Sequence, residues 1–418
     1  MRTIIQPLHI RGATVWNGHE AVEQPLFTDG EFICAQPHPK ALEVDLSGCV
    51  VFPALVNAHD HLELNHYPRS KFRDRYANAH QWGEDMNKRL GDEPFRSLQT
   101  FRLEDRCFIG GLKNLLCGAT MVAHHNPPHH CLFRKDFPVR VLRDYGWAHS
   151  LHFDTPAHLQ QTYRQTPRSA PWFIHLAEGT DESASQEYPR LQEMGCAASN
   201  TVIVHAVGLS ADDADGCVHH IRGIIICPTT NQYLLNQYPT DSDVLAAAIQ
   251  HQNKIAIGSD SRLTADGDLL DEMRFAAGHV FSPNKIGEQH CSPAHCVVQL
   301  ATQGGASIIG AQQSGTLSHG HFADWIAIRQ GEEPPENTLC QARRADLALV
   351  VKGGVPQIGD PEFMRQFTKL PQIEAQLDAQ PKHMHSELAQ RVHNCRLKER
   401  GLEVEALPKR TFRLFSIH

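Results

Sequence analysis

Short apolar runs alternate with longer amphipathic stretches between residues 51 and 312 of the 418-residue chain. Eight strands separated by helical segments are typical of a (β/α)8 barrel, so this alternation predicts an α/β fold of the TIM-barrel type over residues 51–312. The short apolar runs that are strand candidates are 50–56, 120–123, 139–142, 147–152, 172–175, 202–205, 224–227 and 255–257.

The two ends of the chain follow a different pattern. Residues 1–50 hold short β-like pieces separated by turn pairs such as Asn17-Gly18, and residues 313–359 repeat that texture in GTLSHGHFADWIAI and ADLALVVKGGVPQIGD. We therefore expect the two ends to combine into one small β-sandwich domain. Residues 360–418 are predicted to be a helical tail, because EFMRQFT, IEAQLDAQ and SELAQRVHNCRLKER have an amphipathic pattern.

Charge and cysteine content narrow the class of partner. The net charge of -8 and the lack of a basic cluster argue against a nucleic-acid surface. No run of eighteen apolar residues occurs, and the amino terminus lacks an apolar signal segment, which argues against a membrane protein. The 12 cysteines are scattered, so we expect reduced thiols. The expectation is a cytoplasmic protein with a small-molecule substrate, and either a monomer or a homodimer fits.

Potential metal ligands stand at the ends of four predicted strands. His59 and His61 follow the first strand in NAHDHLELN, and residues two apart on a strand point to the same side. His175 ends the fifth strand, His205 the sixth and Asp260 the eighth. A single histidine at a strand end is more often a satisfied polar residue than a ligand. Because barrels place their chemistry at the carboxyl ends of the strands, the set as a whole predicts a metal site.

The chain resembles the amidohydrolase superfamily over nearly its whole length. The resemblance is clearest in three segments, SGCVVFPALVNAHDH, HLAEGTDE and GTLSHGHFADWIAI. HLAEGTDE is similar to the branch that contains guanine deaminase, cytosine deaminase and triazine hydrolases. The resemblance implies that His59, His61, His175 and Asp260 bind the metal, and that Asp260 also accepts a proton from the attacking water. It further implies that His205 orients that water and that Glu178 shuttles a proton to a ring nitrogen and to the departing amine.

Many relatives bind two metals through a modified lysine on the fourth strand. This chain has no lysine between Lys135 and Lys254, so that bridge cannot form there. We therefore expect one divalent metal ion. Zn²⁺ suits imidazole and carboxylate ligands with an open position, and Fe²⁺ tolerates the same set.

Three further residues are candidates for substrate binding. His125, in MVAHHNPP, faces the cavity if the barrel prediction holds, and otherwise lies in a loop. Asn231, in CPTTN, contacts the substrate, supports the site from behind or merely caps a turn. Arg69 meets an anionic group of the substrate or is an exposed surface residue. His80 and Trp82 lie on a segment where relatives contact their substrates, and the sequence gives them no residue-level role.

The predicted function is hydrolytic deamination of an amino-substituted N-heterocycle or an amidine-type small molecule by metal-activated water. One alternative is a cyclic amidase of the imidazolonepropionase type, which opens a ring instead of expelling ammonia. Another is a hydrolase that displaces a halide or an amine at the same site. A third, from a different class, is a metal-free amidohydrolase-like binding protein. Substrate identity stays open because loops shape the pocket.

Overall fold

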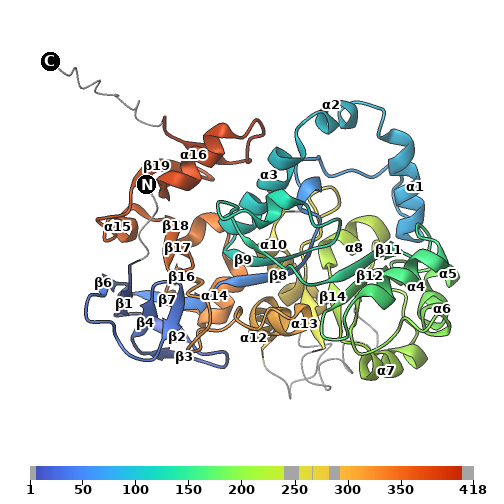
Figure 1. Cartoon of the computed structure of the whole chain (residues 1–418), viewed down its shortest axis with the longest axis horizontal. Coiled ribbons are helices and arrows are strands. Elements are labelled where there is room, and N and C mark those ends of the chain that lie inside the picture. The colour runs from blue at the N-terminus through green and yellow to red at the C-terminus, as the bar shows by residue number, and fades with distance from the viewer. Residues whose placement is uncertain (1–5, 240–253, 266, 282–291, 407–418) are drawn as a thin grey trace.

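The structure is a computed structural model that describes residues 6–239, 254–265, 267–281 and 292–406. Two sheets of parallel strands form its centre, one with the order β10-β9-β8 and one with the order β11-β12-β13-β14-β15 (Figure 1). Their strands are β8 (Leu55–Asp60), β9 (Ala119–His124), β10 (Arg140–Val141), β11 (Gly146–Ser150), β12 (Trp172–Leu176), β13 (Thr201–His205), β14 (Gly223–Ile226) and β15 (Ile255–Ile257).

A strand stands at each of the eight predicted places, and the α/β class is confirmed. The hydrogen-bonded ladder is not continuous around the set, however, because the described strands divide into a sheet of three and a sheet of five. β10 is only two residues long, which leaves little backbone to pair with β11. At the other junction, the backbone N–H of Asp260 donates to the carbonyl of His59 at 3.0 Å, which joins the end of β15 to β8.

The first predicted strand, 50–56, is in fact two strands. β7 (Cys49–Pro53) pairs with β16 (Trp325–Arg329) in a sheet built from the chain ends, and β8 starts only at Leu55. Both pieces are fully buried, so hydropathy alone does not separate them. Pro53 has no backbone N–H and ends the first ladder.

The two chain ends combine, as predicted, in a mixed nine-stranded sheet with the order β21-β19-β20-β18-β17-β16-β7-β2-β3 and a four-stranded sheet with the order β5-β4-β1-β6. In Figure 1 the blue amino-terminal strands lie beside the orange strands from the carboxyl-terminal part. The remaining strands are β1 (Leu8–Arg11), β2 (Thr14–Trp16), β3 (Ala21–Glu23), β4 (Leu26–Asp29), β5 (Phe32–Cys34), β6 (Leu42–Asp45), β17 (Leu347–Lys352), β18 (Val355–Gly359), β19 (Gln372–Leu377), β20 (Gln380–His385) and β21 (Leu402–Val404).

The prediction of a helical tail over 360–418 is wrong in its middle, and its last part, 407–418, lies outside the described residues. α15 (Pro361–Met364) and α16 (Ser386–Asn394) are helices, but β19 and β20 form an antiparallel hairpin within IEAQLDAQ and its continuation. Asp378 and Ala379 make the turn with φ of 50° and 65°, the backbone that two-residue hairpin loops require. The sheet edge offered by β18 gives this segment a partner that local periodicity does not reveal.

Helices follow the central strands along the chain and cover the sheets (Figure 1). Short π-helical turns at Ala276–Val280 and Leu300–Gly304 continue two of them. The helices are α1 (Ala79–Arg89), α2 (Phe95–Gln99), α3 (Leu103–Leu116), α4 (Pro156–Gln165), α5 (Glu182–Ser185), α6 (Glu187–Glu193), α7 (Ala211–His220), α8 (Pro228–Leu235), α10 (Leu269–Phe275), α12 (Pro293–Gln299), α13 (Gly305–Ile309) and α14 (Pro335–Gln341).

The described residues bear on two expectations from the sequence, one about membrane-spanning segments and one about the state of the cysteines. Within those residues, no helix is both long enough and apolar enough to cross a membrane. The described cysteines are free thiols apart from Cys296, which is disulfide-bonded, so the expectation of reduced thiols throughout is wrong at that position. A disulfide needs only a second cysteine within reach, and sequence spacing does not show that distance.

Candidate metal and substrate site

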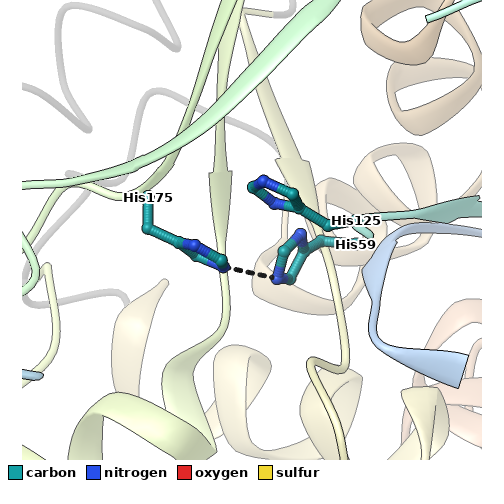
Figure 2. Close-up of side chains that lie close together, drawn as sticks. All are labelled: His59, His125 and His175. Atoms are coloured by element: carbon teal, nitrogen blue, oxygen red, sulfur yellow. Dashed lines mark hydrogen bonds between the residues drawn. The ribbon is translucent and has the colours of Figure 1, made fainter. Parts of the chain in front are cut away.

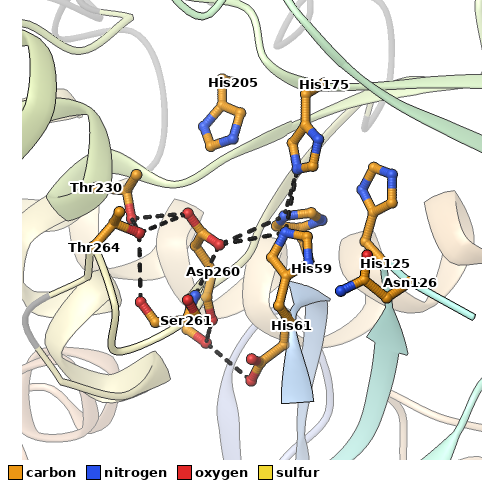
Figure 3. A network of polar contacts seen from close by, with 12 residues as sticks. His59, His61, His125, Asn126, His175, His205, Thr230, Asp260, Ser261 and Thr264 are labelled. Carbon is orange, nitrogen blue, oxygen red and sulfur yellow. Dashed lines mark hydrogen bonds and ion pairs between the residues drawn. The ribbon is translucent and has the colours of Figure 1, made fainter. Parts of the chain in front are cut away.

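The predicted metal ligands meet at one point beyond the carboxyl ends of the strands (Figure 3). Nε2 of His175 lies 3.3 Å from Nε2 of His59 and 3.3 Å from Nε2 of His61. Oδ1 of Asp260 lies 3.9 Å from Nε2 of His59 and 3.6 Å from Nε2 of His61. Ligand atoms bound about 2.1 Å from one ion in a tetrahedral arrangement are about 3.4 Å apart. The spacing of these four side chains therefore fits a single ion.

The electrostatics of these side chains also fit a cation. Burial lowers the pKa of His59, His61 and His175 well below the ordinary histidine value, so all three imidazoles are neutral and offer lone pairs. Burial raises the pKa of Asp260 to about 6, against the opposing effect of hydrogen bonds, of which the one from Thr264 is the strongest. Converging lone pairs beside a carboxylate in a dry site are the donor set that a divalent metal requires.

Several strand ends at the site have a left-handed backbone. His205, Ala206, Ala177 and Asp260 have φ of 80°, 56°, 54° and 50°. Such a backbone is costly for residues other than glycine and persists only where the surroundings fix it. The N–H of Ala177 donates to the buried carboxylate of Glu187 at 2.6 Å, which is one such fixed contact. These bends occur where the chain turns out of β12, β13 and β15 and presents its side chains to the cavity.

Glu178 and His205 form a pair beside the metal ligands. Oε2 of Glu178 lies 3.4 Å from Nε2 of His205. Burial raises the pKa of Glu178 well above its ordinary value, and the charges of Asp260 and Glu187 add to the effect. The shift favours the protonated form of this carboxyl group, which suits a general acid.

Asn231, at the start of α8, supports the pair from behind. Its amide nitrogen lies 3.1 Å from Nδ1 of His205, whose pKa burial lowers to about 3. An amide nitrogen only donates, so Nδ1 accepts and the ring hydrogen of the neutral imidazole is on Nε2, on the side of Glu178. The structure thus brings Asn231 to a supporting position, one of the roles that the sequence left open.

A buried polar network behind the HxH pair was not predicted. Asp60 stands between the two histidines and points to the opposite side of β8, where Nζ of Lys113 lies 2.8 Å from its Oδ2. The same ammonium group donates to Oγ of Ser259 at 2.9 Å, and Asn114 donates to Asp60 at 2.6 Å. Because Ser259 precedes Asp260, the network connects the two strand ends that hold most of the ligands. The sequence signal was a lone lysine within the apolar helix segment GGLKNLL.

His125 lies behind a ligand instead of lining the cavity. Figure 2 shows this side chain near those of His59 and His175. Its ring stacks on that of His175, with centroids 4.2 Å apart and an interplanar angle of 10°, and its Nε2 lies 2.9 Å from the carbonyl oxygen of Ala148. With His59 and His175 it forms a second group of three histidines whose ligand atoms lie within 4.8 Å of one another. This ring therefore packs against His175, and it is not among the residues that line the cavity over the site.

Arg69 is engaged away from the cavity. Its guanidinium donates to the carbonyl oxygens of Thr264 at 2.8 Å and Thr229 at 3.3 Å, and lies 3.9 Å from the ring centre of Tyr233. These contacts join α8 to the loop after β15. The structure does not bring this arginine to the cavity wall, where an anionic substrate group would need it.

A cavity of about 460 Å³ opens over the metal ligands and the Glu178–His205 pair. Its outer wall comes from α1 and adjoining loops, which sequence reasoning identified only as a region. A larger cavity of about 940 Å³ lies beside β10 and contains none of the predicted site residues. The outer wall of the smaller cavity includes Leu64, His80, Trp82, Met86, Asn87, Leu90, Phe153 and Leu263.

The fold and the site together define a class: an α/β protein with a buried histidine and aspartate metal site at the carboxyl ends of parallel strands. The chain belongs to the amidohydrolase family, whose sequence model matches residues 139–357, more than half of the 418 residues. The membership that the motifs predicted is thereby confirmed.

Named relatives agree with that assignment. The chain is 25% identical over 409 residues to a 5-methylthioadenosine/S-adenosylhomocysteine deaminase of Halobacterium salinarum, covering 87% of this chain and 92% of the relative. An atrazine chlorohydrolase from Arthrobacter aurescens TC1 complexed with zinc matches with a TM-score of 0.67 and 18% identity over 84% of this chain and 94% of its own. An adenosine deaminase from Xanthomonas campestris with bound zinc matches with a TM-score of 0.67 and 17% identity over 84% and 92%. The two structures establish a shared fold.

Proposed function

We propose that this protein is a hydrolytic deaminase that removes an amino group from an amino-substituted N-heterocycle. The observation that supports this most directly is a carboxyl group of raised pKa, Glu178, which lies 3.4 Å from His205 in the same cavity as the metal ligands. The 5-methylthioadenosine/S-adenosylhomocysteine deaminase relative and the deaminase of shared fold add weight to it.

One divalent metal ion, Zn²⁺ in this proposal, would be held by His59, His61, His175 and Asp260. The single-ion reading rests on their spacing and on the absence of a lysine from residue 136 to residue 253. When bound, such an ion lowers the pKa of a coordinated water to about 7 and so makes it a nucleophile at neutral pH.

The other steps follow from this chain's side chains. Asp260 accepts a proton from the attacking water, and the Nε2–H of His205 donates a hydrogen bond to the oxygen on which negative charge develops. Glu178 gives its proton to the ring nitrogen next to the attacked carbon, which makes that carbon electrophilic. As the C=O bond forms, the Glu178 carboxylate takes up the proton of the newly added hydroxyl group and passes it to the amino group, so that the C–N bond breaks and ammonia leaves. The proton held by Asp260 then returns to Glu178 and restores the starting state.

In this proposal the eight parallel strands also close into a barrel. The closing contact at β15 and β8 is the backbone hydrogen bond from Asp260 to His59. Closure would hold the ligands of the first and eighth strands side by side, as a single metal site requires.

The test is a substrate screen with the zinc-loaded full chain. Amino-purines and their nucleosides, amino-pterins, amino-triazines, cytosine-like bases and guanidino compounds would be assayed for ammonia, with ring amides and Glu178→Gln protein as controls. A substrate should lose an amino group and gain oxygen, a mass change of about one unit with the ring intact. Gain of a whole water without ammonia would instead establish a cyclic amidase. Ammonia release from no compound would contradict the proposal.

A further inference from the structure

The cavity has two chemically different halves. Its floor consists of strand ends with the metal ligands, Glu178 and His205, whereas its outer wall is mostly apolar, with His80 and Asn87 as its polar members. The apolar side chains of that wall are Leu64, Trp82, Met86, Leu90, Phe153 and Leu263. A substrate whose reacting carbon lies at the floor must therefore place the rest of its structure against hydrocarbon surface.

The position of the wall is fixed relative to the catalytic carboxyl. The first residue of α1, Ala79, donates its N–H to the carbonyl of Glu178 at 2.8 Å, and the N–H of Thr180 donates to the carbonyl of Ala77 at 2.7 Å. Nδ2 of Asn78, the residue that caps α1, donates to Asp181 at 2.7 Å. These hydrogen bonds hold α1 against the loop after β12. They therefore fix the distance between the outer wall and Glu178.

The side chains of the wall are held as well. The indole N–H of Trp82 donates to the carbonyl of Ser70 at 3.0 Å, which fixes one edge of the ring. Met86 packs in an apolar cluster with Tyr67, Phe95 and Leu263. The outer wall therefore has a defined shape before a ligand binds, as ligand pockets usually do.

The charges around the cavity are negative or neutral. Among the described residues that line it there is no lysine or arginine, and the acidic residues are Glu178, Glu187 and Asp260. Oε1 of Glu187 lies 3.1 Å from Nε2 of His80. An anionic group laid along the outer wall would be buried without a cationic partner, which is a costly state.

We infer that the substrate is an amino-heterocycle with a neutral, apolar substituent that lies along α1, and that a substituent with a carboxylate or a phosphate is rejected. That the substrate contains an amino-heterocycle rests on the proposed function. That its substituent is neutral and apolar rests on the apolar side chains of the outer wall and on the lack of lysine and arginine among the described residues that line the cavity. A volume of about 460 Å³ is large enough for a heterocycle with one such substituent.

Matched ligand pairs test the inference by affinity instead of turnover. Zinc-loaded Glu178→Gln protein would be titrated calorimetrically with 5-methylthioadenosine and with its analogue that has a carboxymethylthio group in place of the methylthio group. The two share the heterocycle and the thioether and differ in one carboxylate. A second pair would be an alkylthio-aminotriazine and its carboxyalkylthio analogue. The neutral member should bind about 30-fold more tightly in whichever pair binds. Equal affinity, preference for the anionic member, or no binding by either pair would overturn the inference.

A charge introduced at the mouth of the cavity sharpens the test. Leu90, at the end of α1, lines the cavity and is 36% exposed, so a longer polar side chain can be accommodated there. Leu90→Lys should raise the affinity for the anionic member relative to the neutral one by about tenfold, and Leu90→Gln should not. An unchanged ratio in a folded Leu90→Lys protein would contradict a substituent lying on α1. If wild-type protein releases no ammonia from a neutral ligand that it binds, the proposed function fails while this inference stands.

Discussion

The two halves of the cavity differ in how they are built. The floor stands on parallel strands whose backbone is fixed by ladders and by a fully buried network around Lys113, and His59 is only 1% exposed. The outer wall stands on one helix and its neighbouring loops, and reaches solvent at Leu90. The groups proposed to hold a metal and to move protons thus lie in the half whose backbone is fixed by strand pairing, whereas the groups proposed to contact the rest of the substrate lie on a helix and loops.

Substitutions in the floor and in the wall should therefore have different effects. Substitutions in the floor should change metal content, kcat or stability. Substitutions in the wall should change KM and ligand preference while the metal stays bound.

The largest effect is expected for His59→Ala. Removing one imidazole from the converging set should reduce the metal content from about one equivalent to near zero and bring turnover to background. Elemental analysis after purification without chelator measures the first, and ammonia release the second. Met86→Ala, in the wall, is the matched control and should keep its metal. A His59→Ala protein with a full equivalent of metal would remove this residue from the ligand set.

Glu178→Gln should lower kcat by about two to four orders of magnitude, because the amide keeps the shape of the side chain but cannot donate an acidic proton. Its metal content should equal that of wild type, which separates a proton shuttle from a ligand. Steady-state kinetics and elemental analysis on the same preparation check both points. Turnover close to wild type would rule out the assigned role.

Lys113→Met should leave the Asp60 carboxylate buried without its cation and destabilise the protein by about 3–5 kcal/mol. Because Asp60 lies between two ligands, metal affinity should also fall, by about 10- to 100-fold. Urea unfolding of metal-free protein and competition with a chelator measure the two effects. The double variant Asp60→Asn with Lys113→Met removes both charges and should recover part of the stability. Additive losses in that cycle would mean that the pair does not interact.

The pH dependence of stability should show the buried Glu272, which accepts hydrogen bonds from the backbone and the hydroxyl of Thr229. Burial raises its pKa to about 8 in the folded state, from an ordinary value of 4.5. Between these two pH values the folded protein holds a proton that the unfolded chain has lost. Stability therefore falls as pH rises across this window, by up to about 1.4 kcal/mol per unit.

Glu272→Gln should remove that contribution, so the difference in stability between variant and wild type should grow with pH from about 5 to 8. Urea unfolding of both metal-free proteins across this range measures it, and groups common to the two proteins cancel. A difference independent of pH would show that the carboxyl does not retain its proton.

The smallest effect is expected in the wall. Met86→Ala removes apolar contact near the substituent and should raise KM by about three- to tenfold for a neutral substrate, without loss of metal. Steady-state kinetics with the best compound from the screen checks this. A fall in kcat alone would place this side chain with the floor and erase the distinction between the halves.

Local pattern predicted much of the floor. Eight apolar runs marked the places of the central strands, and residues at their ends supplied His59, His61, His175 and Asp260 as neighbours. This succeeds because parallel strands of one sheet end at one edge, so a position at the end of a strand already defines a place in space.

Other features were decided only by tertiary structure. Hydropathy could not divide the apolar run 49–56 between two sheets, nor see that the hairpin at 372–385 had a strand edge to pair with. Asp60, Lys113 and Ser259 come from segments far apart in the chain, and the local sequence around each of them does not indicate that they are in contact. Likewise the apolar wall on α1 gains its role only from its anchorage beside Glu178. The sequence by itself determined which groups end the strands, while folding over long separations determined what those groups face.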